Sequence, residues 1–273
     1  MTALKETLNW EAVETPLYDA NGNQIQGWKQ IKNSESGETL NIAKSSYTVA
    51  PNGQLVEMAE SVADFANFDL QGYETFDGGQ KVMAYLKSKE NSLIAGVESC
   101  NYLVIGNSHD GQGAYFTALT NHIYRCKNMF SSYSKQNRIF HHSGIIDRIK
   151  QAEETINLFY DHKDGVFKQA DQMSQKKLSA KQLNYHRKAF AFECLQIDPK
   201  KEMGTRAQNR FNDFQESIET ELTDLGNNAW ALFNGATRFS THSMKEAKSA
   251  FGQLFNSPRR LNDRAWKYCS KIK

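Results

Sequence analysis

The chain has 273 residues, of which 39% are hydrophobic, 11% aromatic and 23% charged. This composition supports a packed core in one large or two small domains and excludes a disordered chain. The net charge of +2 conceals an asymmetry, because residues 1–98 carry −7 and residues 99–273 carry +9. No apolar run approaches the roughly 20 residues of a membrane helix, and the start of the chain does not resemble a signal peptide. We therefore expect a cytoplasmic protein with no membrane partner.

The first part of the chain has the alternating pattern of an antiparallel sheet. Asn21-Gly22 marks a tight turn, and Ser34–Gly37 marks a second one. Between these turns, Gln24, Gln26, Trp28 and Gln30 alternate with Ile25, Gly27, Lys29 and Ile31. We expect strands over residues 10–18, 25–32, 40–44 and 47–49.

A helix and further strands follow. Asn52 is expected to cap a helix, in which Leu55, Met58 and Val62 recur at helical spacing. Asp77-Gly78-Gly79 predicts a turn, and the segment after Gly106 predicts a hairpin with a glycine-containing tip. The expected strands are 73–76, 82–86, 102–106 and 115–119.

From about residue 121 the spacing of apolar residues becomes helical, with a polar loop expected over 161–177 and a helix break at Asp198-Pro199. The order of strands, helix, strands and then helices predicts an α+β fold. Its core would be an antiparallel sheet with one inserted helix, β-β-β-α-like, in a domain of residues 1–160. Residues 161–273 would form a helical C-terminal region.

Few motifs of enzyme sites occur. The four cysteines are far apart, so we expect buried, reduced thiols and no zinc ribbon. Gly78-Gly79-Gln80-Lys81 lacks the spacing of a phosphate loop. His109-Asp110 is consistent with either a metal or acid–base pair or, as we favour, a hairpin tip on Asp-Gly. We predict no catalytic residue, metal or cofactor, and the protein is more consistent with a non-enzyme.

Residues 121–150 are rich in cations and aromatic rings. Cations bind a phosphate backbone, and flat rings stack on unpaired bases of any sequence. The alternative is that the rings belong to a core and the cations are solvated. The candidate DNA-binding residues are Arg125, Lys127, Lys135 and Arg138, with Tyr133 and Phe140 as stacking residues and Lys44 and Lys81 from the strands.

Several segments carry a family resemblance. Tyr102–Gly111 with its Ser-His-Asp-Gly, then Arg125-Cys126-Lys127-Asn128, Ile139–Ser143 and Asn228–His242, resemble a phage- and plasmid-like family of unknown function. Gly235 stands where that family usually has alanine. The order of elements is in turn similar to the RecT and Red beta single-strand annealing superfamily, by analogy of fold.

The resemblance implies ATP-independent binding and annealing of single-stranded DNA in phage or plasmid recombination, by a ring- or filament-forming homo-oligomer in the host cytoplasm. Two alternatives stay open. One is a metal-dependent nucleic-acid enzyme that uses His109, Asp110 and His141 or His142. The other is a phage-encoded interaction or anti-defence protein that binds no nucleic acid.

Overall fold

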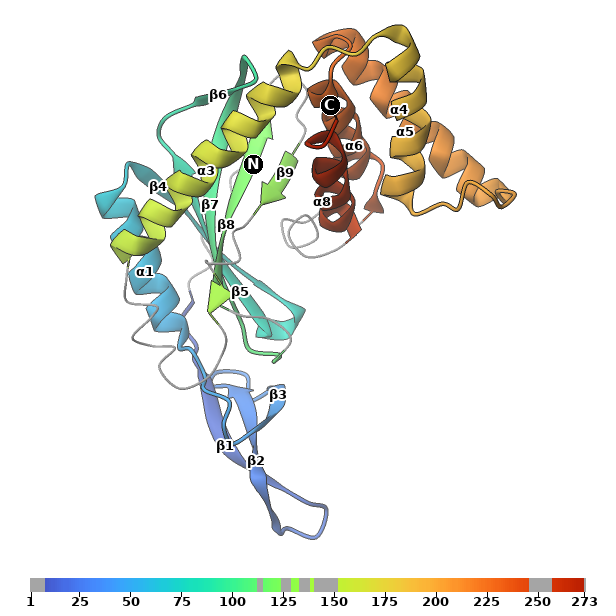
Figure 1. The fold of residues 1–273 in the computed structure, drawn as a ribbon. Coiled ribbons are helices and arrows are strands. Elements are labelled where there is room, and N and C mark those ends of the chain that lie inside the picture. The colour runs from blue at the N-terminus through green and yellow to red at the C-terminus, as the bar shows by residue number, and fades with distance from the viewer. Residues whose placement is uncertain are drawn as a thin grey trace. The chain divides into compact units, whose positions relative to one another are not determined.

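The structure, a computed structural model, describes residues 8–111, 115–123, 129–132, 138–139, 152–245 and 257–272 (Figure 1). Two compact units divide the chain. Unit 1 comprises residues 1–90, 101–119 and 133–162, and unit 2 comprises residues 91–100, 120–132 and 163–273. Each unit thus gathers several segments, whereas the domain boundary predicted after residue 160 cuts the sequence once.

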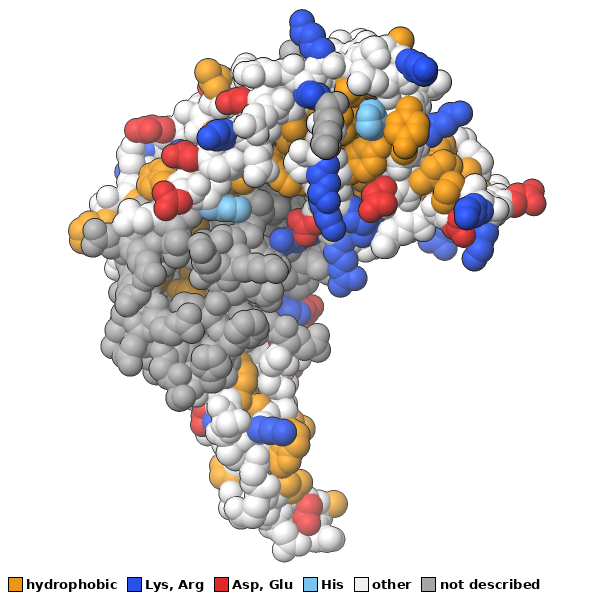
Figure 2. Space-filling model, in the orientation of Figure 1, with side chains coloured by type: hydrophobic (Ala, Val, Ile, Leu, Met, Phe, Trp, Pro, Cys, Tyr) orange, Lys and Arg blue, Asp and Glu red, His pale blue; other side chains and the backbone are white. Residues whose placement is uncertain are grey.

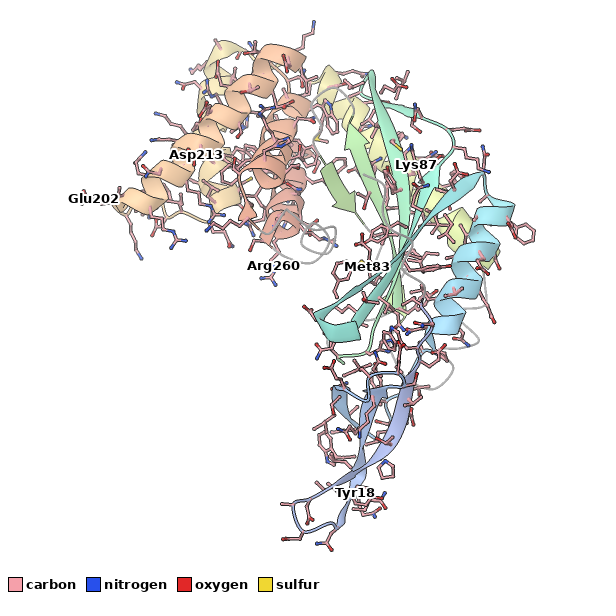
Figure 3. All side chains as sticks on the ribbon, turned by 180° about the vertical axis from the view of Figure 1, so that it is seen from behind. Tyr18, Met83, Lys87, Glu202, Asp213 and Arg260 are labelled. Carbon is pink, nitrogen blue, oxygen red and sulfur yellow. The ribbon has the colours of Figure 1, made fainter. Side chains whose placement is uncertain are left out.

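A small antiparallel sheet opens the chain in the order β1-β2-β3. Its strands are β1 (Ala12–Tyr18), β2 (Gln24–Asn33) and β3 (Thr39–Lys44), close to the predicted ranges. The carboxylate of Asp19 accepts hydrogen bonds from the backbone of Asn21 and Asn23 in the first turn, and Figure 3 shows Tyr18 at the end of this hairpin. The strand predicted over 47–49 is wrong, because this segment has no strand structure and Tyr47 instead donates to the Ser108 carbonyl at 3.2 Å.

The larger sheet has the strand order β10-β8-β7-β5-β4, with β6 paired to β7 and β9 to β8. Helix α1 (Asn52–Phe65) packs against β4 and β5 (Figure 1). The strands are β4 (Phe68–Phe76), β5 (Lys81–Ser88), β6 (Ser92–Ile94), β7 (Val97–Ser108), β8 (Tyr115–Ile123), β9 (Met129–Ser132) and β10 (Arg138–Ile139).

The described residues of 121–139 form strands rather than the helix that the sequence predicts. Residues 121–123 continue β8, and the described residues of 129–139 lie in β9 and β10, both paired to β8. The helices are α3 (Ala152–Gln175), α4 (Ala180–Leu195), α5 (Thr205–Leu225), α6 (Ala229–His242) and α8 (Ser257–Cys269). Together with the sheets they confirm the predicted α+β fold with a mostly helical C-terminal region.

The loop predicted over 161–177 is wrong, because α3 runs through most of it. Val166, Ala170 and Met173 are buried and recur at the i, i+4 and i+7 spacing of one helix face. The many polar residues of this segment occupy the remaining faces. The helix after Asp198-Pro199 begins at Thr205, so the break predicted there is confirmed.

Gly235 allows α5 and α6 to approach closely. A Cβ at this position would lie 2.6 Å from the Cα of Ile218, which is closer than real Cβ contacts. A glycine at this position thus permits the close packing of these two helices in unit 2. No helix in the described part of the chain is long and apolar enough to cross a membrane.

Candidate nucleic-acid interface

The Ser-His-Asp-Gly segment at the end of β7 forms a buried polar cluster in unit 1. The His109 side chain is inaccessible to solvent, and its Nε2 lies 2.9 Å from Oδ1 of Asn52, which accepts the hydrogen bond. Asn52 Nδ2 donates in turn to the carbonyl of Trp10 at 3.0 Å, and the Trp10 and His109 rings meet edge to face. The histidine therefore ties β7 to the start of α1 and to the chain before β1.

The start of α1 differs from the prediction. Asn52 is the first helical residue, and its side chain does not cap the helix. The carboxylate of Glu11 instead accepts from the backbone N–H groups of Asn52 (2.6 Å) and Gly53 (2.8 Å). A negative charge at this position also complements the helix dipole. Capping from outside the helix leaves the Asn52 side chain available for His109.

The Asp110 side chain contacts Lys81 and Ser108. Its carboxylate lies 3.2 Å from the Lys81 ammonium and accepts from the Ser108 hydroxyl, and Lys81 also reaches Asp77 at 2.7 Å. Burial lowers the pKa of Lys81, but hydrogen bonds and charge from Asp77 and Asp110 raise it further, so the pKa lies above its ordinary value. Lys81, a predicted phosphate contact, is thus engaged in an internal network.

The cluster has the geometry of a structural turn. Gly111 follows with φ of +72°, a conformation that glycine adopts readily, and a Cβ there would meet the Asn41 amide at 2.9 Å. The described residues contain no group of three or more His, Cys, Asp or Glu side chains that could hold a metal ion. His141 and His142, the other members of the predicted metal alternative, lie outside the described residues.

Most of the predicted DNA-binding residues cannot be placed. Arg125, Lys127, Tyr133, Lys135 and Phe140 lie outside the described residues. The backbone of Arg138 lies in β10, opposite Phe116 of β8. The DNA-binding roles of these residues stay predictions. Lys44 is the remaining candidate whose surroundings the structure describes.

Lys44 lies at the end of β3 directly opposite Trp28 of β2. Directly paired residues project from the same face of a sheet, with Cβ atoms about 5 Å apart. The next pair on this face is Gln30 and Ile42, and Val13 of β1 lies opposite Lys32. Trp28 is 42% exposed and Ile42 51% exposed, although large apolar side chains usually lie in the interior.

We call the surface formed by Val13, Trp28, Lys32, Ile42 and Lys44 the β1–β3 face. It contains two lysines and no carboxylate, and neither lysine forms an ion pair with a residue that the structure describes. Figure 2 shows hydrophobic side chains beside a cationic one on this small sheet. A flat ring beside unpaired cations is the combination that binds a polyanion carrying aromatic bases.

The opposite face of the same sheet is different. Ile31 and Ala43 are buried there, and Lys29 is neutralised by Glu14 at 2.8 Å. The sequence alternation placed Trp28 and Gln30 together but did not identify Trp28 as a functional residue. Its proximity to Lys44 depends on the β2–β3 register, which a bulge after Ile31 shifts.

One family model matches the chain, over residues 39–266, and its description is a domain of unknown function, DUF932. The chain belongs to the DUF932 family. No curated protein and no solved structure matches this DUF932 protein. The match begins at β3, so Lys44 and the Ser-His-Asp-Gly cluster lie inside it, whereas Trp28 lies before it.

Proposed function

We propose that this DUF932 protein binds single-stranded DNA and anneals complementary strands without ATP, in phage or plasmid recombination. The observation that supports this proposal is the pairing of exposed Trp28 with Lys44 on the β1–β3 face. The excess of basic residues over 99–273 and the cations within 121–150 also favour a polyanionic ligand.

The two side chains have complementary roles. The Trp28 indole stacks on an unpaired base, an interaction of about 1–3 kcal/mol that tolerates any base because every base has a π-face. The Lys44 ammonium, about 5 Å away at the Cβ level, binds an adjacent phosphate and releases its counterions. Binding of this kind requires neither sequence readout nor nucleotide hydrolysis.

Annealing requires that bound bases stay accessible to a second strand. A flat sheet surface holds a strand along one side and leaves its other side open, unlike a closed channel. We further propose that the protein is a homo-oligomer, a ring or a filament, in which β1–β3 faces of neighbouring copies bind consecutive stretches of one strand.

Trp28→Ala tests the proposal. We expect the affinity for a labelled oligo-dT strand to fall by about 5- to 150-fold, the equivalent of one lost stacking contact. Phe65→Ala is the matched control, because Phe65 is an aromatic residue of unit 1 that is 84% exposed at the end of α1. Affinity is measured by fluorescence anisotropy over a range of salt concentrations.

Annealing is followed with two complementary labelled strands in the absence of ATP. The proposal predicts that the rate falls with Trp28→Ala and not with Phe65→Ala. An affinity that does not decrease with salt concentration, or a Trp28→Ala protein that binds like the wild type, contradicts it.

A further inference from the structure

Helix α4 of unit 2 presents a second aromatic residue between lysines. Lys181, Tyr185 and Lys188 follow each other at i, i+4 and i+7, so they share one face of the helix. All three are exposed, and Tyr185 is 69% exposed. At 1.5 Å per residue the two lysines are about 10 Å apart along the axis, one on each side of the ring.

The tyrosine ring is supported by the interior of the unit. It packs edge to face on His186 at 5.3 Å between ring centroids. His186 Nδ1 in turn lies 3.0 Å from the hydroxyl of Tyr268 on α8, and the Tyr268 ring contacts buried Phe190 at 5.2 Å. An exposed ring held in this way loses less conformational freedom when a planar ligand stacks on it.

The cationic side chains of this helix differ in whether they form ion pairs. Arg187, on the adjoining face, is neutralised by Glu219 of α5 at 2.6 Å. Lys181 and Lys188 have no ion pair with any residue in the described ranges. The helix contains no carboxylate before Glu193. Figure 2 shows further Lys and Arg side chains over the helices of this unit.

We infer that this face of α4, the Lys181–Tyr185–Lys188 stripe, is a second binding surface for single-stranded DNA. The inference rests on the proposed function and extends it, because the stripe repeats the chemistry of the β1–β3 face on a different compact unit. A base stacks on Tyr185, and the two lysines bind the phosphates on either side. One chain with two such surfaces can hold two strands, as annealing requires.

Photocrosslinking tests the two surfaces separately. Full-length protein is irradiated with a bromodeoxyuridine-substituted single strand, and the crosslinked peptides are identified by mass spectrometry. Crosslinks to both the Trp28 and the Tyr185 peptides support both proposals. A crosslink at Trp28 without one at Tyr185 overturns the α4 inference alone. A crosslink at Tyr185 without one at Trp28 overturns the β1–β3 face alone, and crosslinks at neither overturn both.

Variants give the functional readout. Tyr185→Ala and the pair Lys181→Gln and Lys188→Gln are each expected to slow annealing about fivefold or more, the lower end expected from one stacking contact. Tyr185→Phe should retain the wild-type rate, since it keeps the ring. Lys200→Gln with Lys201→Gln is the matched control, with the same charge change on exposed lysines after α4. Equal rates for the two double variants, or a Tyr185→Ala rate equal to the wild type, overturn the inference.

Discussion

The Ser-His-Asp-Gly cluster and the β1–β3 face lie in the same compact unit and use their polar residues in opposite ways. In the cluster, His109 is buried against Asn52, and Asp110 is held by Lys81. On the β1–β3 face, Trp28 is 42% exposed, and Lys44 has no ion pair with a described residue. The polar side chains of the cluster contact neighbouring residues of the fold, whereas the face presents its ring and its ammonium group to solvent.

A conspicuous sequence motif can therefore stabilise the fold without contacting a ligand. Buried polar groups are costly to leave without partners, so a cluster that supplies those partners fixes the fold. Cations and rings in solvent contribute little to stability and are available to a binding partner. Variants of the cluster should therefore change stability, and variants of the face should change affinity.

The largest expected effect is that of His109→Ala. Removal of the buried imidazole leaves a cavity and deprives Asn52 Oδ1 of its donor, which should cost about 2–4 kcal/mol of unfolding free energy. Urea unfolding measures this cost. Folded His109→Ala protein should bind oligo-dT with the affinity of the wild type. A lost affinity at unchanged stability would show instead that the cluster contacts the ligand.

Lys81→Gln should have a smaller effect in the same direction. The substitution removes the cation from Asp110, whose side chain is 5% exposed, and we expect a loss of about 1–3 kcal/mol in unfolding free energy. The salt dependence of DNA binding should not change, because the Lys81 ammonium is engaged with Asp77 and Asp110. A shallower salt dependence would place Lys81 in the phosphate-binding surface after all.

Lys44→Gln should change the salt dependence of DNA binding and leave the stability of the protein nearly unchanged. Stability should stay within about 0.5 kcal/mol of the wild type, as for most surface substitutions. The slope of log affinity against log salt should become shallower by about 0.7, the contribution of one phosphate contact to a single strand. Lys29→Gln is the control, since Lys29 is on the opposite face and paired with Glu14. Identical slopes for the two variants would remove Lys44 from the interface.

Local patterns in the sequence predict much of the fold. Turn signals and alternation located β1 and β2 close to their observed bounds. Helical spacing located α1 and predicted the helical character of the region that contains α4, α5 and α6. The pattern failed where composition conflicted with it. The stripe of Val166, Ala170 and Met173 was present in 161–177, but three small or medium apolar residues among many polar ones do not stand out.

The candidate site was less predictable, because its contacts join residues far apart in the chain. Lys44 was identified from its charge alone, and its neighbour Trp28 follows from the strand register. The partner of His109 is 57 residues away, and the Glu11 that caps α1 is 41 residues before Asn52. Tyr185 had no signal in the sequence apart from its spacing to Lys181 and Lys188.

The smallest expected effect is a change in the pH dependence of stability caused by His186, whose ring contacts the exposed Tyr185. Burial lowers the pKa of His186, and burial lowers that of His162 as well. The folded state therefore binds protons more weakly than the unfolded state, whose histidines titrate near pH 6.5. Stability is retained above that pH and falls as the pH decreases below it.

His186→Gln should flatten this loss of stability on the acid side, measured by urea unfolding at a series of pH values. His162→Gln should flatten it separately, and the double variant should show both effects. At about pH 8 the imidazoles are neutral in both states, so the stability of each variant there reports only the lost contacts. A pH dependence identical to the wild type in the double variant would mean that burial of these two imidazoles does not govern the acid-side stability. In that case the His186 imidazole that contacts Tyr185 would bind a proton as readily in the folded state as in the unfolded state.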